Sequence, residues 1–217
     1  SGEPRQAARW VRFARVAVAE AGAPPALQAT LLNNEGVLAH RSGDFRAAVL
    51  AHQQALALRL EQLGPQHPLI ARTHSNLGAA WKALGHADDA REAYELALRI
   101  EEATLAPTHP QVAETLNNLG NVLLDQGAHA QAREALERAL HIKESTFGPE
   151  ALPVAVTLSN LGSALIKLGD EREADAALLR ALRIKRARAG DDALTVAVTL
   201  TNLAELRRQQ RRWEEAV

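Results

Sequence analysis

Cysteine is absent from this 217-residue sequence, which excludes disulfide bonds and thiolate chemistry. Aromatic residues make up only 3% of the chain, too few for a protein that binds nucleic acid by stacking bases on aromatic side chains. No apolar run approaches the roughly 20 residues needed to span a bilayer, so the sequence predicts no membrane segment.

An excess of charge of either sign is also missing. The chain has 25 basic and 26 acidic side chains and a net charge of −1. A nucleic-acid-binding surface would need a basic excess, because phosphate contacts dominate its affinity. The charge balance therefore argues against nucleic acid as a partner.

Hydrophobic residues are abundant at 47%, and much of this content is alanine and leucine. These two residues are the best helix formers, and alanine lets helices pack at short range. Composition alone therefore favours an all-α protein.

The sequence repeats itself without any insertion or deletion. An asparagine opens a tripeptide that recurs every 42 residues: Asn34-Glu35-Gly36, Asn76-Leu77-Gly78, Asn118-Leu119-Gly120, Asn160-Leu161-Gly162 and Asn202-Leu203-Ala204. Glycine follows each of the first four asparagines by nine residues, and alanine follows each by 14 and by 21 residues. Such self-similarity indicates a repeat architecture.

Each period predicts two helices, helix A followed by helix B. In the third copy, Val112, Leu116, Leu119 and Leu123 are spaced 4, 3 and 4 residues apart, as on one face of a helix. A second apolar face follows after Gly127, which suits the end of helix A.

The pattern resembles the tetratricopeptide repeat. In the second copy, the residues that carry the resemblance are Leu77, Gly78, Ala90, Tyr94 and Ala97. The usual unit has about 34 residues, and the long form seen here is similar to the kinesin light chain repeat and to arrays attached to bacterial protein kinases and other signalling proteins. The resemblance implies a right-handed α-solenoid of antiparallel helix pairs.

The period also sets the expected organisation, which is one solenoid domain. We expect the two ends to be incomplete repeats, so that the chain is a segment of a longer protein. The predicted ranges are 1–22 (helix B of a preceding partial repeat), 23–64, 65–106, 107–148, 149–190, and 191–217 (partial fifth repeat).

In proteins that this chain resembles, the A helices line a concave groove, where repeated asparagines hold the main chain of an extended peptide. Such an asparagine ladder here would comprise Asn34, Asn76, Asn118, Asn160 and Asn202. A carboxamide has donors and an acceptor, so it can pair with a peptide unit. The alternative is a structural role, in which each asparagine bonds to a neighbouring helix.

Other groove-facing positions implied by the family pattern would give selectivity. They include Arg72 and Lys82 in the second copy, Asn117 and Asn121 in the third, and Lys167 in the fourth. We hypothesise that the first two repeats take an acidic stretch of the partner. The alternative is that these are ordinary solvated charges.

No motif for a cofactor, a metal or catalysis is present. The sequence lacks a phosphate-binding loop, a His-Glu-x-x-His motif and a Gly-x-Ser-x-Gly motif. His67 and His74 are seven residues apart, but His67 recurs as His109 at the same point of the repeat, which favours a role at a helix start.

We therefore predict a non-catalytic scaffold that binds a protein or peptide, without cofactor, in the cytoplasm. The alternative is a regulatory segment of a larger kinase or protease that self-associates through its exposed terminal helices, making a homo-oligomer. Its solution mass as a function of concentration would distinguish the two.

Overall fold

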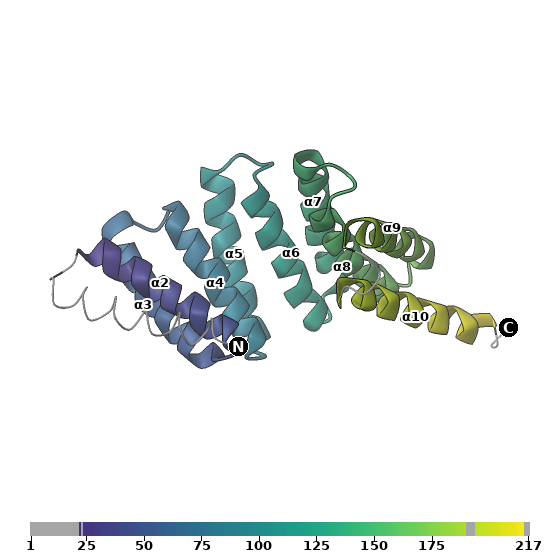
Figure 1. Cartoon of the computed structure of the whole chain (residues 1–217), viewed down its shortest axis with the longest axis horizontal. Helices are drawn as coiled ribbons and strands as arrows, with labels where there is room; N and C mark the ends of the chain where they lie inside the picture. The colour runs from purple at the N-terminus through teal and green to yellow at the C-terminus, as the bar shows by residue number, and fades with distance from the viewer. Residues whose placement is uncertain (1–21, 23, 190–193, 215–217) are drawn as a thin grey trace. The chain divides into compact units, whose positions relative to one another are not determined.

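The computed structural model describes the backbone of residues 22, 24–189 and 194–214, and the side chains of residues 22, 24–188 and 196–210. Every regular element in this part of the chain is an α-helix (Figure 1). No helix in these ranges combines the length and the apolar character needed to cross a membrane.

The chain divides into two compact units, Ser1–Leu105 and Ala106–Val217. The described helices of the first unit are α2 (Pro25–Arg41), α3 (Phe45–Leu63), α4 (Pro68–Ala83) and α5 (Ala87–Thr104). Those of the second unit are α6 (Pro110–Asp125), α7 (His129–Phe147), α8 (Leu152–Leu168), α9 (Glu171–Ala189) and α10 (Leu194–Glu214).

The even-numbered helices are the predicted A helices, and α3, α5, α7 and α9 are the predicted B helices. The helix predicted within residues 1–22 lies outside the described residues, apart from Gly22. The division into 42-residue repeats remains our proposal for how the chain is organised.

Local sequence sets where the helices begin and end. Pro68 and Pro110 open α4 and α6, where a missing N–H costs nothing. The Nδ1 atoms of His67 and His109 accept hydrogen bonds from the backbone N–H groups of Leu69 and Gln111, at 3.1 and 3.2 Å. These two histidines therefore act at helix starts, as their shared repeat position predicted.

The glycines between helices A and B adopt left-handed backbone angles. Gly43, Gly85, Gly127 and Gly169 have φ between 76° and 83°. Residues with a Cβ rarely adopt such angles, so glycine allows the chain to turn sharply from helix A to helix B.

A different set of glycines allows helices A and B of one pair to approach closely. A Cβ atom added at Gly120 of α6 would lie 2.6 Å from Cγ of Leu136 on α7. The same fit joins Gly36 with His52, Gly78 with Tyr94 and Gly162 with Leu178. The missing side chain of each glycine is thus replaced by a buried side chain of helix B, which fills the core between the two helices.

Within each unit, the two sides of the helical layer are built differently. The A helices contact one another, since α2 packs on α4, and α8 packs on both α6 and α10. No backbone contact as close joins the described B helices α3 and α5, or α7 and α9.

Ion pairs between long side chains join α7 to α9 and to the residue just before it instead. Arg133 reaches Asp170 and Glu173 at 2.9 and 3.1 Å, and Arg180 reaches Glu144 at 2.6 Å. Because the A helices of the second unit are closer together than its B helices, this unit curves towards its A-helix side.

Candidate binding face on the A helices

The five asparagines of the predicted ladder each lie on a different A helix. Asn34 is exposed on α2, whereas the other four are half-buried, Asn76 on α4, Asn118 on α6, Asn160 on α8 and Asn202 on α10. Two therefore belong to the first unit and three to the second. We call the side formed by the A helices of each unit its A-helix face.

Three of these asparagines hydrogen-bond to the preceding A helix. Nδ2 of Asn76 donates to Oδ1 of Asn33 at 3.0 Å, and Nδ2 of Asn160 donates to Oδ1 of Asn117 at 3.2 Å. Nδ2 of Asn202 donates to Oγ of Ser163 at 2.8 Å. These bonds connect neighbouring A helices, and they are the kind of contact that the structural alternative predicts for Asn76, Asn160 and Asn202.

Asn117 does not lie where the family pattern placed it. Sequence reasoning put it among the groove-facing residues, but its side chain is only 5% exposed. Its Oδ1 accepts hydrogen bonds from Asn160 and also from Oγ1 of Thr157, at 3.0 Å. The close packing of α6 against α8 buries it, so it supports the A-helix face from beneath.

Sequence reasoning missed a buried ionic position near the end of each B helix. Its occupants are 42 residues apart and at most 3% exposed: Arg59, Glu101, Lys143 and Lys185. Four buried threonines share another repeat position on the A helices: Thr73, Thr115, Thr157 and Thr199. The signal was present in the sequence, because one repeat position is charged in each of the four helices α3, α5, α7 and α9.

Lys185 shows how such a charge is accommodated. Its Nζ donates hydrogen bonds to Oγ of Ser159 at 2.7 Å and to Oγ1 of Thr199 at 2.8 Å. Burial lowers the pKa of the Lys185 ammonium group to about 8, because the protein interior solvates the charge less well than water does.

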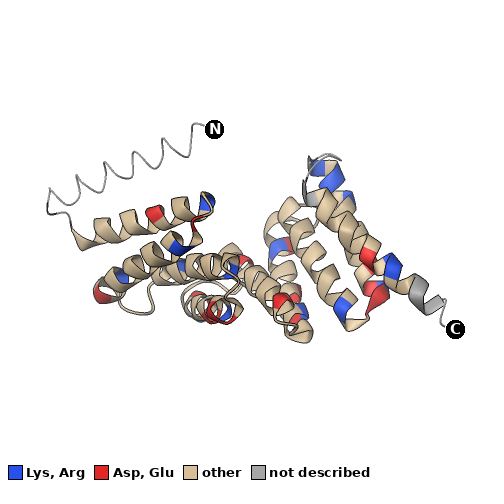
Figure 2. Cartoon of the chain, turned by 90° about the horizontal axis from the view of Figure 1, so that it is seen from below, with Lys and Arg blue, Asp and Glu red and all other residues tan. Residues whose placement is uncertain are grey.

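Blue Lys and Arg and red Asp and Glu occur on helices of both units (Figure 2). The polar residues predicted to give selectivity are divided between the units. Arg72 is exposed and Lys82 is half-buried, both on α4. In the second unit, Asn121 is half-buried on α6 and Lys167 is exposed on α8. Lys167 lies near Glu205 of α10, whose pKa is lowered to about 2, mainly by hydrogen bonds from Arg208 and Gln209.

Replacing Asn160 with alanine should lower the free energy of unfolding by about 0.5–1.5 kcal/mol, because Asn117 loses one of its two side-chain donors. Urea unfolding followed by circular dichroism would measure this loss. Asn121→Ala is the control, since no hydrogen bond joins Asn121 to another helix in the described structure. Equal stability of the two variants would contradict a structural role for Asn160.

The described residues hold no group of three or more potential ligands that could bind a metal ion. They form a series of antiparallel helix pairs, in each of which a glycine of helix A packs against a buried side chain of helix B. Within each unit, short polar side chains join adjacent A helices. These features define a helical-repeat scaffold.

The tetratricopeptide repeat model matches residues 27–103, 82–145, 111–187 and 153–217, and the chain therefore belongs to the tetratricopeptide repeat family. The repeats of this family imply a protein–protein interaction scaffold, and the chain is built as one. A comparison with curated protein sequences gave no match.

Solved structures agree with this fold. The crystal structure of BtubC (BKLC) from P. vanneervenii has a TM-score of 0.78 and 26% identity, covering 98% of this chain and 85% of that one. A putative kinesin light chain from P. anserina has a TM-score of 0.73 and 21% identity, covering 89% and 91%. The apo form of RapI has a TM-score of 0.76 and 16% identity, covering 86% and 65%.

Proposed function

We propose that the chain captures an extended segment of a partner protein along its A-helix faces, through the asparagine ladder. The observation that carries this proposal is one half-exposed or exposed asparagine on every described A helix. Packed helices lie about 8–10 Å apart, which corresponds to about three residues of an extended chain. Successive asparagines would therefore meet every third residue or so of the bound segment.

The cross-helix bonds are compatible with this role. A carboxamide offers two donor hydrogens and an acceptor oxygen, and the bond from Asn76 to Asn33 uses one of these hydrogens. The bond also fixes the orientation of the amide before a partner arrives. Binding then costs less side-chain entropy, because the amide is already ordered.

Different side chains around the ladder would give selectivity. On α4 the exposed residue four positions before the asparagine is the cation Arg72, and Lys82 follows on the same helix. The equivalent residues in the second unit include Val156 and Val198, which are 38% and 50% exposed. We expect a partner segment with acidic residues for the first unit and apolar residues for the second.

The test begins with 12-residue peptides selected for binding from a random library. We expect Asn34→Ala/Asn76→Ala, which changes two asparagines of the first unit, to weaken a peptide bound by this unit by roughly five- to a hundredfold, since each lost hydrogen bond is worth about 0.5–1.5 kcal/mol. Fluorescence anisotropy with the labelled peptide measures this change. Gln53→Ala/Gln54→Ala is the control, because both glutamines are exposed on α3.

A second measurement asks whether the peptide main chain is read. N-methylation of alternate amides in the selected peptide removes main-chain donors and leaves its side chains unchanged. Affinity should fall if the asparagines hold the main chain. Unchanged affinity in both experiments would contradict ladder capture, and association of the free protein with rising concentration would favour the self-assembling alternative.

A further inference from the structure

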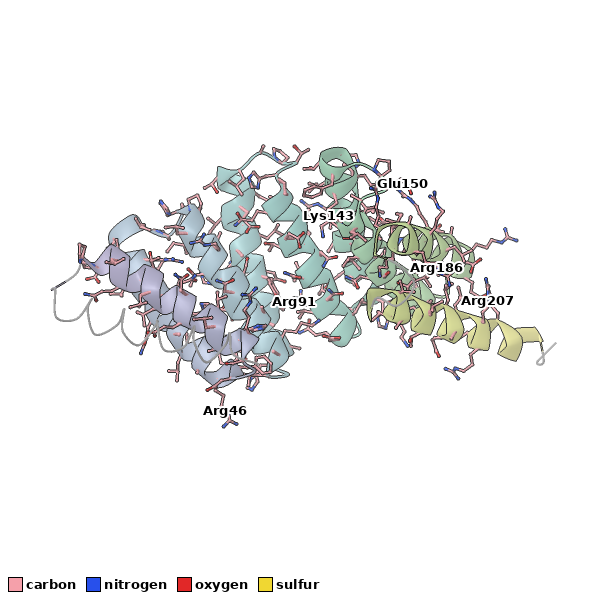
Figure 3. The ribbon with its side chains drawn as sticks, in the orientation of Figure 1. Arg46, Arg91, Lys143, Glu150, Arg186 and Arg207 are labelled. Carbon is pink, nitrogen blue, oxygen red and sulfur yellow. The ribbon has the colours of Figure 1, made fainter. Side chains whose placement is uncertain are left out.

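An ion pair in the second unit shows how a carboxylate on the A-helix face can neutralise a buried cation. Lys143 of α7, labelled in Figure 3, is 2% exposed. Its Nζ lies 3.2 Å from Oε1 of Glu114 on α6. The Glu114 side chain is 57% exposed, so it meets solvent while its carboxylate holds the ammonium group below. A buried cation of this kind needs such a partner, because desolvation of an uncompensated charge is costly.

The first unit has a buried cation at the same repeat position but no carboxylate beside it. Arg59 of α3 occupies the repeat position of Lys143 and is also 2% exposed. The residue that corresponds to Glu114 is Thr30, whose Oγ1 donates to the carbonyl oxygen of Ala26 at 2.9 Å. No ion pair joins Arg59 to a carboxylate among the described residues.

The guanidinium group of Arg59 is only partly satisfied. Its Nη1 donates to the carbonyl oxygen of Leu69 at 3.2 Å and to Oγ1 of Thr73. Its buried Nη2 has no hydrogen-bond partner in the described structure. A buried donor without a partner costs free energy, and an added acceptor would recover it.

A second guanidinium group lies close to the first. Arg72 is exposed on α4, immediately before Thr73. Burial, and then the positive charge of Arg72, both lower the pKa of Arg59. The two arginines therefore concentrate positive charge at one place on the first unit, with one arginine buried and one reaching into solvent.

We propose that Arg59 and Arg72 form a site for an Asp or Glu side chain of the captured partner segment, which takes the place that Glu114 holds in the second unit. This inference rests on the proposed function, because the carboxylate arrives on a segment held along the A-helix face. Guanidinium groups suit the role, since their paired N–H donors match the two oxygens of a carboxylate.

The third buried cation, Lys185, is stabilised in a different way. At Lys185, the residue that corresponds to Glu114 is Val156, and no carboxylate is supplied from that position. The hydroxyl groups of Ser159 and Thr199 accept hydrogen bonds from the Lys185 ammonium group instead. Arg59 has a single hydroxyl partner, that of Thr73, and keeps an unused donor.

The probe for this site is a fluorescein-labelled octapeptide of glutamates, acetylated and amidated so that it carries no terminal carboxylate. The matched peptide of glutamines is the uncharged control. We expect the glutamate peptide to bind the wild-type protein at least about tenfold more tightly. Arg72→Gln should remove about tenfold of that affinity, and because Arg72 is exposed the variant should fold normally.

Thr30→Glu provides the sharper test, because it supplies within the chain the carboxylate that Glu114 supplies in the second unit. It should raise the melting temperature and abolish the preference for the glutamate peptide. Thr30→Gln, of the same shape but uncharged, should do neither. Equal binding of the two peptides to wild type, or the same affinity in Thr30→Glu and Thr30→Gln, would overturn the carboxylate site.

These results separate the site from the proposed function. If Thr30→Glu has no effect while the asparagine double variant weakens the library-selected peptide, ladder capture stands and the carboxylate site is wrong. If Thr30→Glu and Arg72→Gln weaken the glutamate peptide while the asparagine variant has no effect on the selected one, the cation site binds carboxylates without a ladder.

Discussion

Replacing Leu136 with alanine is expected to lower the free energy of unfolding of the second unit by about 2–5 kcal/mol. Leu136 is fully buried and fills the space left by Gly120 between α6 and α7. The substitution leaves a cavity that two rigid helices cannot close. Hydrogen exchange of the α6 and α7 amides would measure the loss locally, which matters because long repeat arrays need not unfold in one step.

A second substitution tests the cause of this loss. Gly120→Ala alone should destabilise the protein by about 1–3 kcal/mol through overpacking, because the new Cβ would lie 2.6 Å from Cγ of Leu136. In the Leu136→Ala background, the Cβ added by Gly120→Ala enters the cavity and should raise the free energy of unfolding. If the two losses simply add, the close fit between these residues is not what holds the pair together.

Acid should selectively weaken the first unit through His52. This residue occupies the position of Tyr94, Leu136 and Leu178, and it is 1% exposed against Gly36. Burial, followed by the positive charges of His40 and Arg59, lowers its pKa to about 4. Its Nδ1 has no hydrogen-bond partner in the described structure, so no acceptor at that atom would stabilise the protonated, charged ring.

The direction of the pH effect follows from the two states. In the unfolded chain His52 takes up a proton near its ordinary pKa of about 6.5, whereas in the folded chain it stays neutral down to about pH 4. The contribution of neutral His52 to the free energy of unfolding is therefore fully present above pH 6.5 and is lost as the pH falls towards 4. The loss should reach about 3 kcal/mol.

His52→Leu is the control for this prediction, since leucine fills the same position against Gly120 and Gly162. Carboxylate titration is common to both proteins and cancels when their stabilities are subtracted at each pH. The free energy of unfolding of the variant, measured with urea, should rise steadily relative to that of the wild type as the pH falls from 6.5 to 4. A constant difference between the two proteins across this range would show that His52 does not titrate on unfolding.

The sequence predicted the helices well because their determinants are local. Pro68 at the start of α4 and the left-handed Gly85 after it act within a few residues, and a strict period repeats them along the chain. The role of each asparagine could not be obtained in this way. The acceptor for Asn76 lies 43 residues earlier, on Asn33, and only the packing of α4 against α2 brings the two together.

The burial of the ionic position on the B helices was not predicted, for a related reason. A charged residue near a helix end is usually solvated, so nothing local in the sequence marks Lys143 or Arg59 as buried. Their burial depends on the next A helix covering them, which is a property of the stack rather than of one repeat. A charge that recurs at one position in four successive periods, beside small and apolar residues, was the available clue.

The ion pairs of Arg133 and Arg180 on the outer side of the second unit have a mechanical consequence. Charge pairs at a surface weaken as ions screen them, whereas the buried hydrogen bonds between Asn117, Thr157 and Asn160 on the inner side do not. Salt should therefore weaken the contacts between the B helices of this unit, whereas the contacts between its A helices should stay the same. We therefore expect the bend of this unit to change with ionic strength, while the spacing of its A helices stays constant.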